Sequence, residues 1–479
     1  MAIDFEELAN GGMSADQLAN VFLREYYSGK EISYPINPFQ MLTDLKIAFL
    51  LRPFKKYEGI YIPAEDKEDF PIVGINLLRP IVRQRFTAAH ELCHHLKDVH
   101  SGFMCATNAK SEIEKYAENF ASELLMPTVE LKKQAQKYAK DGYVDLDGVL
   151  LIADYFGVSF LSCLYKIAYR LHMIQGDTDA ETLQKLARKY KPAVKRKEQG
   201  KYDTVLYEQL FDAIGDNFRL KPTEYACQKF KTEYVFHDSR LEGIDIDMET
   251  AAAIVMDLRF HKQNSPYCRE ENQNIIEVAG LTFAYDYAFS EAESEISIYD
   301  AKHLNEQLFS TAPCPEYGGR YRESNTLVLG AKFETIDYRK IPEEMYFLDK
   351  EIRTLMDEYE ELPLSKYVER VIQIHHRMTV IHAFRDGNGR TTRAFANMLL
   401  LKRNVSPVFF RDKEKDEYKE ALKVADLSGK YDMLYERFFK SILSSFAALS
   451  DFRMYSLWNV GAECRLEIML TGTLIYLSY

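Results

Sequence analysis

Apolar residues recur every three or four positions in several stretches of the N-terminal region, a spacing that predicts amphipathic helices. One such stretch is 14–30, and "VRQRFTAAHELCHHLKDV" is a second, expected to end near Asp98. A third, "EIEKYAENFASELLM", is stopped by Pro127. Between the first two, "GIYIP" and "IVGINLL" are rich in β-branched residues, which predicts strands. The pattern therefore predicts an α+β domain at the start of the chain.

Two further regions are predicted to be helical. "LDGVLLIADYFGVSFLSCLYKIAYRLHMI" gives helices broken at Gly157, and residues 344–447 are again mostly helical in pattern. Between these regions lies "RKYKPAVKRKEQGKYD", residues 188–203, which is basic and polar and contains Pro192 and Gly200. Charge runs of this kind are usually solvated connectors, so we interpret the segment as an interdomain linker.

Composition narrows the class of protein. The chain of 479 residues has a net charge of −12, which does not favour direct nucleic-acid binding, because phosphate neutralisation needs clustered Lys and Arg. Its seven cysteines form no CxxC pair, as is typical of a reducing cytoplasm. The start lacks a signal-peptide pattern, and "IMLTGTLIYL" is about half the ~20 residues of a membrane span. We expect a cytoplasmic protein with no membrane segment.

The first candidate for chemistry is "HELCH". His90 and His94 lie four positions apart, so on a helix both imidazoles share one face and can bind one metal ion. Glu91 lies next to them and can take a proton from a metal-activated water. In the next predicted helix, Glu114 follows at a span that allows it to return as a third ligand, and Glu118 could orient an imidazole.

"RFTAAHELCHHLKDVH" followed by "EKYAENFASELLMP" resembles the ImmA/IrrE family of zinc peptidases over roughly residues 10–185. The resemblance implies that His90, His94 and Glu114 bind Zn²⁺ and that Glu91 is the general base. It also implies a repressor or antitoxin-like protein as substrate. The chain departs from the family at Cys93, where a small residue is usual. A metal-binding sensor domain that does not cleave is the alternative interpretation.

The second candidate is "HAFRDGNGRTTR", residues 382–393, placed between two predicted helices. Backbone amides at a helix N-terminus favour an anion, and Gly387 and Gly389 permit close approach. Arg390 and Arg393 lie three positions apart at the start of the second helix, so both can reach one polyphosphate. The motif therefore predicts a nucleotide-phosphate site.

Three further side chains of this motif have chemistry suited to a phosphate. Asn388 can donate to a phosphate oxygen, and Asp386 is an oxygen ligand suited to Mg²⁺. His382 is then free to act as a base on an attacking hydroxyl. Together these groups indicate in-line transfer to or from a nucleotide, with charge stabilisation supplying most of the catalysis.

The pattern H-x-F-x-[DE]-G-N-G-R-x-x-R resembles the signature of the Fic family, over about residues 225–447. The resemblance implies transfer of AMP from ATP to a Ser, Thr or Tyr hydroxyl of a target protein. The resemblance also implies that His382 is the base and that the phosphates are bound by Asn388, Arg390, Arg393 and the backbone amides of the loop. Ala383 is a departure, because the family usually has Pro there.

Two flanking stretches also resemble parts of the Fic family. "GGRYRESNTLVLGAKF" (318–333) is similar to its β-hairpin flap, and "HDSRLEGIDID" is similar to its inhibitory helix. Glu242 and Gly243 fit the inhibitory pattern, although Asp238 occupies its hydroxyl position. Glu242 could pair with Arg393 and restrain the site, or it could orient a water and make AMP removal the main activity.

These observations predict a two-domain enzyme. The expected parts are an α+β zincin-like metallopeptidase domain (1–187), a connecting segment (188–224), a mainly α-helical Fic domain with a β-hairpin flap (225–450) and a tail of unknown role (451–479). ATP and a target-protein hydroxyl are the expected partners. Regulator cleavage joined to protein modification is associated with toxin–antitoxin systems. The sequence leaves the oligomeric state and any communication between the domains open.

Overall fold

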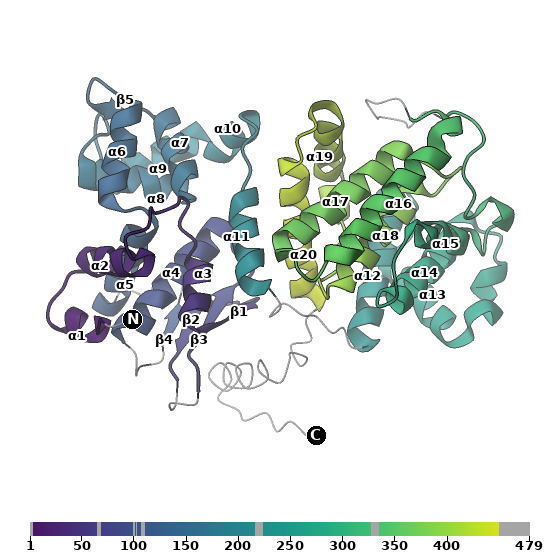
Figure 1. Cartoon of the computed structure of the whole chain (residues 1–479), viewed down its shortest axis with the longest axis horizontal. Coiled ribbons are helices and arrows are strands. Elements are labelled where there is room, and N and C mark those ends of the chain that lie inside the picture. The colour runs from purple at the N-terminus through teal and green to yellow at the C-terminus, as the bar shows by residue number, and fades with distance from the viewer. Residues whose placement is uncertain are drawn as a thin grey trace. The chain divides into compact units, whose positions relative to one another are not determined.

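The computed structural model describes residues 3–64, 69–98, 101, 103–106, 111–215, 224–326 and 335–449 (Figure 1). The chain divides into two compact units, and the division lies between Ile214 and Gly215. This position falls inside the connecting segment expected from the sequence. The predicted tail, 451–479, and residues 327–333 of the predicted flap lie outside the described residues.

The first unit contains a four-stranded mixed sheet in the order β1-β3-β2-β4. Its strands are β1 (Ala48–Arg52), β2 (Tyr57–Ile62), β3 (Ile72–Asn76) and β4 (Phe103–Ala106). β1 pairs with β3 in parallel, whereas β2 pairs antiparallel with both β3 and β4. Helix α4 (Ile81–Lys97) packs against β2 and β3, and α5 (Glu112–Leu125) packs against α4. The sheet thus supports one side of the helix that carries the HExxH motif.

The unit has further elements, of which α6 to α9 lie above the sheet in Figure 1. These further elements are α1 (Phe5–Asn10), α2 (Ala15–Tyr27), α3 (Pro38–Asp44), α6 (Thr128–Tyr138), α7 (Leu146–Phe156), α8 (Phe160–Lys166), α9 (Ala180–Tyr190), α10 (Pro192–Glu198), α11 (Thr204–Ile214) and a short hairpin of β5 (Ala139–Lys140) and β6 (Tyr143–Val144). The helix break expected at Gly157 falls between α7 and α8.

The helix of the HExxH motif has the limits that its sequence predicts. α4 ends at Lys97, and the amide of Asp98 closes it by donating to the His94 carbonyl at 2.8 Å. Basic side chains in its last turn suit the partial negative charge of a helix C-terminus. α5 is equally well defined, because the Ser111 hydroxyl caps it by accepting from the amide of Glu114.

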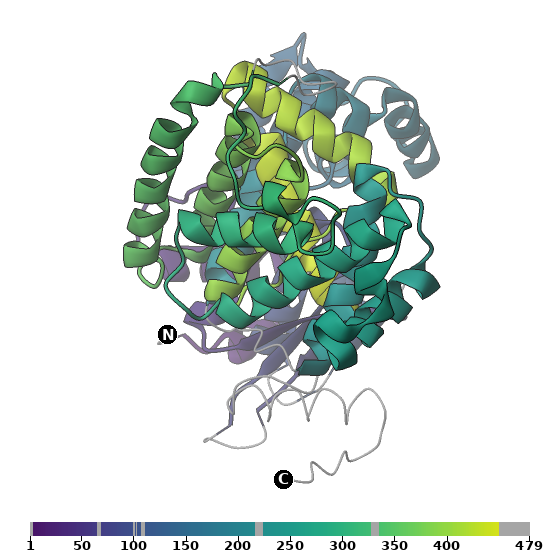
Figure 2. The same ribbon diagram turned by 90° about the vertical axis from the view of Figure 1, so that its right-hand side faces the viewer.

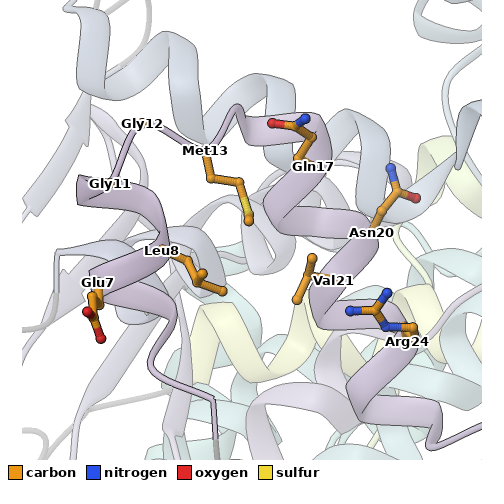
Figure 3. A pocket seen from close by; sticks show the side chains of 9 residues that line it. All are labelled: Glu7, Leu8, Gly11, Gly12, Met13, Gln17, Asn20, Val21 and Arg24. Atoms are coloured by element: carbon orange, nitrogen blue, oxygen red, sulfur yellow. The ribbon is translucent and has the colours of Figure 1, made fainter.

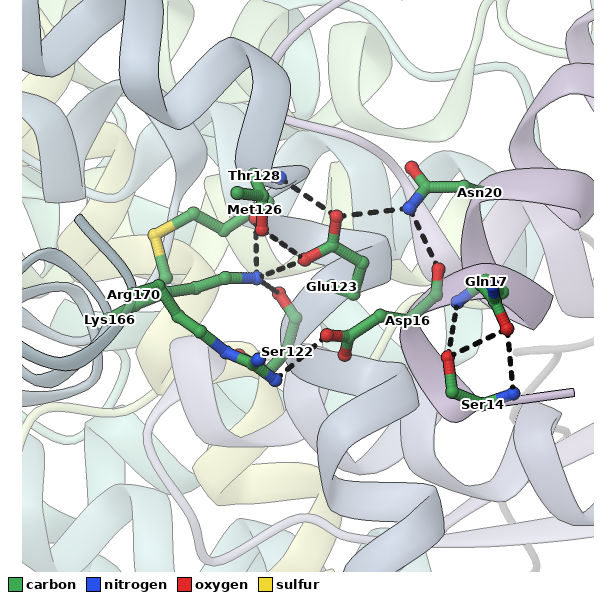
Figure 4. A network of polar contacts seen from close by, with 10 residues as sticks. All are labelled: Ser14, Asp16, Gln17, Asn20, Ser122, Glu123, Met126, Thr128, Lys166 and Arg170. Atoms are coloured by element: carbon green, nitrogen blue, oxygen red, sulfur yellow. Dashed lines mark hydrogen bonds and ion pairs between the residues drawn. The ribbon is translucent and has the colours of Figure 1, made fainter.

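A buried ion pair fastens α5, α6 and α8 together (Figure 4). Lys166 Nζ donates to Glu123 Oε2 at 2.7 Å and to the carbonyls of Ser122 and Met126 at 3.0 and 2.7 Å. Glu123 also accepts from the amide and hydroxyl of Thr128 at 2.9 and 2.7 Å, at the start of α6. The C-terminal carbonyls of α5 and the first amide of α6 therefore find their partners in one pair of charged side chains.

The segment 188–203, expected to be a solvated linker, is partly helical. It includes the end of α9 and the whole of α10. Arg196 pairs with Asp154 and Asp203, both at 2.7 Å, so the segment is tied to α7. The following helix, α11, packs on α3 and α4. There the fully buried Arg85 of α4 donates to Gln209 of α11 and to the Ile36 carbonyl.

The second unit is built from helices that cross one another at several angles (Figures 1 and 2). They are α12 (Glu224–Glu242), α13 (Met248–His261), α14 (Gln273–Glu291), α15 (Ile298–Phe309), α16 (Ile341–Glu358), α17 (Leu364–Ile381), α18 (Asn388–Lys402), α19 (Lys415–Ser428) and α20 (Asp432–Leu449). α18 lies at the centre, in contact with α14, α15 and α17, and nearly all of its side chains are buried. The long helical region expected from residue 344 onward is therefore present.

Within the described ranges, no single helix is long and apolar enough to span a membrane. Leu146–Phe156 and Phe160–Leu171 reach that length only as a pair, with a bend of 109° between them. Most of the apolar side chains of this pair are buried in one core cluster of the first unit.

Candidate functional sites

The HExxH helix and the helix after it bring three potential metal ligands together. His90 and His94 project from α4 and Glu114 projects from the first turn of α5, and all three are buried. His90 Nε2 lies 3.0 Å from Glu114 Oε2 and 3.3 Å from His94 Nε2. One ligand atom from each residue lies within 4.8 Å of the others. The chain between the two helices thus brings Glu114 back to the two histidines, as the sequence suggests.

The donor set fits a zinc ion. With Zn–N bonds of about 2.05 Å and a tetrahedral angle, two ligand nitrogens are expected about 3.3 Å apart. The two Nε2 atoms are separated by 3.3 Å. Two imidazoles and one carboxylate also leave a fourth position open, as in catalytic rather than structural zinc sites. Burial lowers the pKa of His90, but the hydrogen bond to Glu114 and nearby carboxylates outweigh it, so that pKa is raised.

Glu91 is fully buried on the side of α4 that faces the sheet. A Cβ atom at Gly59 of β2 would lie 2.2 Å from Glu91 Oε1 and 2.5 Å from a methyl of Thr87. The strand therefore has no side chain at the one position where the Glu91 carboxylate needs space. Sequence reasoning identified Glu91 but not Gly59, because the two meet only through the packing of α4 on β2.

Asp98 is a functional candidate that sequence reasoning missed. Its Oδ2 lies 3.1 Å from His94 Nδ1, the nitrogen on the opposite side of the ring from the ligand atom. Such a contact fixes the tautomer and orientation of a metal-binding imidazole. Glu118, which the sequence suggested for this role, is exposed on α5. The sequence spacing does indicate this contact, since Asp98 follows His94 by four residues, about one helical turn.

The second motif forms a loop between α17 and α18. His382 follows the last residue of α17 in a left-handed conformation, with φ at 50°, and Gly387 precedes α18 with φ at 72°. Phe384 is buried. The Asn388 side chain accepts a hydrogen bond from the Phe384 backbone amide and donates one to the Phe384 carbonyl, each at 2.8 Å. The Asn388 amide thus braces the loop itself. The first amides of α18 remain as candidate anion donors.

Two residues outside the motif hold this loop in place, and sequence reasoning assigned neither of them a role. Arg322 donates to the His382 carbonyl from its side chain at 2.8 Å and to the Ala383 carbonyl from its backbone at 2.9 Å. The fully buried Asn305 of α15 donates to the Asp386 carbonyl at 3.1 Å. Asn305 also accepts from the amide of Gly319 at 3.0 Å, so it joins the loop to the start of the segment expected to be a flap.

Arg390 and Arg393, near the start of α18, are paired with carboxylates from other helices. Arg390 Nη1 donates to Glu277 Oε2 of α14 at 2.6 Å. Arg393 pairs through Nε with Asp238 and through Nη2 with Glu242 at 2.5 Å, both on α12. Glu242 is the last residue of that helix, and Gly243 follows with φ at 91°.

Gly389 leaves room for the pair of Glu242 and Arg393. A Cβ atom there would lie 2.7 Å from Glu242 Oε1 and 2.8 Å from Arg393 Nη1. Burial raises the pKa of Asp238. Burial also acts to raise the pKa of Glu242, but the positive charge of Arg393 outweighs it and the pKa of Glu242 is lowered. The lowered pKa keeps the Glu242 carboxylate ionised at neutral pH.

The remaining groups of the loop suit a base and a cation ligand. Burial and the charge of Arg322 lower the pKa of His382, so its imidazole is neutral at physiological pH and can accept a proton. The Asp386 side chain is 72% exposed at the loop surface, where its carboxylate can reach a cation bound to phosphates. The oxygen chemistry of this position suits Mg²⁺.

A pocket of the first unit is formed by α1, the turn after it and α2 (Figure 3). Its lining mixes charged, amide and apolar side chains with the backbone of the turn, and it is open to solvent: Glu7, Leu8, Gly11, Gly12, Met13, Gln17, Asn20, Val21 and Arg24. None of the candidate metal ligands lines it.

The fold and the two sites define a chain of two units, one with a metal-ligand triad beside a mixed sheet and one with an arginine-rich loop at a helix N-terminus. Residues 43–168 match the family model of the IrrE N-terminal-like domain, and residues 295–400 match that of the Fic/DOC family. The match to the IrrE N-terminal-like model thus falls within the first unit, and the match to the Fic/DOC model falls within the second.

The curated relatives are adenylyltransferases. The chain is 27% identical to protein adenylyltransferase fic-1 of Caenorhabditis elegans over 194 residues, 40% of this chain and 36% of the relative. It is 27% identical to protein adenylyltransferase Fic of Nematostella vectensis over 214 residues, 43% and 45% of the two chains. A probable protein adenylyltransferase of Aquifex aeolicus is 34% identical over 106 residues, 22% and 30%. The chain spans less than half the length of each.

A solved structure of Caenorhabditis elegans Fic-1 is also similar to this chain. The two are 19% identical, with a TM-score of 0.41, and the match covers 67% of this chain and 91% of the other. A Fic-domain signalling protein of Bacteroides thetaiotaomicron gives a TM-score of 0.39 at 19% identity, covering 46% and 85%.

Proposed function

We propose that the second unit transfers AMP from ATP to a Ser, Thr or Tyr hydroxyl of a target protein. One observation carries this proposal. A neutral imidazole, an exposed carboxylate and two arginines converge on the loop at the N-terminus of α18. The naming of the curated relatives as protein adenylyltransferases supports the same activity.

Each of these side chains has a distinct role in the proposed transfer. Asp386 would hold Mg²⁺, which would supply neutralisation of phosphate charge, and Arg390 and Arg393 would bind the β- and γ-phosphates. The target hydroxyl attacks the α-phosphorus while His382 accepts its proton. The bond between the α-phosphorus and the α–β bridging oxygen breaks, and pyrophosphate leaves in line. The fixed cations and the helix amides stabilise the charge that develops on the leaving group.

We further propose that Glu242 restrains this activity by occupying Arg393. Incubation of purified Glu242→Gly protein with α-labelled ATP and Mg²⁺ is expected to label the enzyme itself or a target, and adding His382→Ala should abolish the label. Glu249→Gly, at an exposed position in the first turn of α13, is the matched control and should behave as wild type. An unlabelled Glu242→Gly protein contradicts the transferase proposal.

AMP removal is a second candidate activity, favoured by the position of the Glu242 carboxylate close to Gly389 in the loop. In this reaction Glu242 orients a water molecule instead of excluding a phosphate. A premodified target incubated with wild-type protein then releases AMP, and Glu242→Gly does not. Labelling by Glu242→Gly without any release by the wild type favours restraint alone.

For the first unit we propose a zinc-dependent peptidase that acts on a regulator protein such as a repressor or antitoxin. His90, His94 and Glu114 would hold Zn²⁺, which supplies an activated water when bound. Glu91 would accept the proton of that water and pass it to the leaving amine of the cleaved peptide bond. The tight packing of Glu91 against Gly59 supports a fixed direction for this base.

Two measurements test the peptidase. Zinc content by mass spectrometry should fall in His94→Ala but not in His95→Ala, since His95 lies on the same helix and contacts the Tyr61 hydroxyl instead. New protein N-termini in cells expressing wild type should be absent with Glu91→Gln. Zinc binding with no cleavage that depends on Glu91 would instead identify the first unit as a metal-binding sensor.

A further inference from the structure

Arg390 and Arg393 of α18 are held in parallel ways by two different helices. Glu242 at the end of α12 pairs with Arg393, and Glu277 in the first half of α14 pairs with Arg390. The motif that suggested Glu242 as a restraint does not extend to Glu277, which lies 113 residues before Arg390. The proposed function therefore assigns no role to the pairing of Glu277 with Arg390.

Glu277 is held in position by a second hydrogen bond, whereas Arg390 has a spare N–H donor. Glu277 Oε1 accepts from Gln273 one helical turn earlier at 2.9 Å, while Oε2 lies 2.6 Å from Arg390 Nη1. The Arg390 side chain is 7% exposed, and its Nε is buried without a hydrogen-bond partner among the described residues. A buried guanidinium with a spare donor is poised for a further acceptor.

The local charge shows that an anion cannot simply be added. Arg390 and Arg393 contribute +2, and the four carboxylates that lie within 4.0 Å of them contribute −4 when all are ionised: Asp238, Glu242, Glu277 and Asp386. A polyphosphate must therefore replace carboxylates. The exposure of each side chain indicates which carboxylates a ligand can displace. The Asp238 side chain is 2% exposed and stays in place, whereas the side chains of Glu242 and Glu277 are 35% and 26% exposed and can move away.

We propose that Glu277 is a specificity-determining residue of the nucleotide site, a second carboxylate that a polyphosphate displaces from Arg390 while it displaces Glu242 from Arg393. Loading is then an exchange at both arginines. A ligand with several linked phosphates must displace both carboxylates, whereas AMP has no β- or γ-phosphate and displaces neither. Glu277 thereby lowers the preference of the site for nucleoside polyphosphates over monophosphates. This inference rests on the proposed function for the identity of the nucleotide.

Calorimetric titration with magnesium tripolyphosphate and with AMP tests the exchange directly. Glu277→Gln is expected to bind tripolyphosphate about tenfold more tightly than wild type, which corresponds to about 1.4 kcal/mol. The preference for tripolyphosphate over AMP should grow by a similar factor, because AMP has no β- or γ-phosphate to bind Arg390 and its affinity should stay unchanged. Combining Glu277→Gln with Glu242→Gly should add to the gain, since each carboxylate acts on its own arginine.

Two matched variants separate competition from packing. Glu277→Asp keeps the charge and should retain wild-type affinity. Glu293→Gln changes an exposed glutamate about 20 Å further along the direction of α14 and should have no effect. If tripolyphosphate binding to Glu277→Gln is unchanged or weaker than to wild type, Glu277 supports Arg390 rather than competing for it, and the proposal is wrong.

The outcome is independent of catalysis. Tighter binding in Glu277→Gln without AMP transfer by any variant keeps this inference and removes the proposed function. Labelling by Glu242→Gly with no change in binding on Glu277→Gln does the reverse.

Discussion

Replacing Lys166 by Met tests whether the buried ion pair of Figure 4 stabilises the first unit. Lys166 Nζ donates to Glu123, Ser122 and Met126, and the side chains of Lys166 and Glu123 are 6% and 2% exposed. Methionine fills similar space but leaves the Glu123 carboxylate buried without its counter-ion. Removing one partner of a buried pair costs about 3–5 kcal/mol.

The neighbours of Glu123 place the expected loss at the lower end of that range. Thr128 and Asn20 continue to donate to the carboxylate after the lysine is removed. We therefore expect a loss of about 3–4 kcal/mol, which for a unit of this size lowers the melting temperature by roughly 6–16 °C. Differential scanning calorimetry of the full chain measures this shift, and the transition that moves on adding zinc identifies the first unit.

A double variant checks the cause. Lys166→Met combined with Glu123→Gln removes the stranded charge while keeping an acceptor for the Thr128 amide. It should be at least about 1 kcal/mol more stable than the sum of the two single losses predicts. Additive losses, or a single-variant loss below about 1 kcal/mol, would refute the view that the pair is charged and buried in the folded protein.

Three other outcomes are expected. Asp98→Asn should weaken zinc affinity about 10- to 100-fold in a chelator competition, with helix content unchanged; equal affinity would exclude Asp98 as the partner that orients His94. Because burial lowers the pKa of His382 and the base must be neutral, transfer by Glu242→Gly should rise with pH only below about 6.5 and stay level above it; a midpoint above pH 7 contradicts this role. Gly59→Ala should cost about 1–3 kcal/mol by crowding Glu91 while zinc binding persists.

Local patterns predicted much of the fold. The limits of α4 and α5 follow from helical periodicity with Pro127 as a stop, and the left-handed φ of Gly387 at the entry to α18 follows from its place in the motif. Both are decided by residues close together in sequence. The segment 188–203 was expected to be a solvated linker because of its charge, but Arg196 finds a partner in Asp154, 42 residues earlier. Charge alone does not reveal such a pairing.

The predicted site residues were those that carry chemistry, and the unpredicted ones were residues that contact them from distant parts of the chain. Asn305, Arg322 and Glu277 reach the loop from 60 to 113 residues away. Nothing in their local sequence distinguishes them from ordinary helix or loop residues. The Asn388 amide also acts within the loop, since its geometry depends on the path of the backbone from Phe384. The roles assigned to individual site residues remain predictions that the variants above test.

The place of Glu242 at the end of α12 determines what its release would require. Terminal turns of helices fray on their own, with opening free energies far below that of global unfolding. Gly243, with φ at 91°, ends the helix directly after it, while Asp238 stays buried one turn earlier. Unwinding a single turn is therefore enough to release Glu242 from Arg393, which keeps its pairing with Asp238, with no rearrangement of the helices around it. Such a transition is fast, and hydrogen exchange at the amides of residues 239–243 would report it.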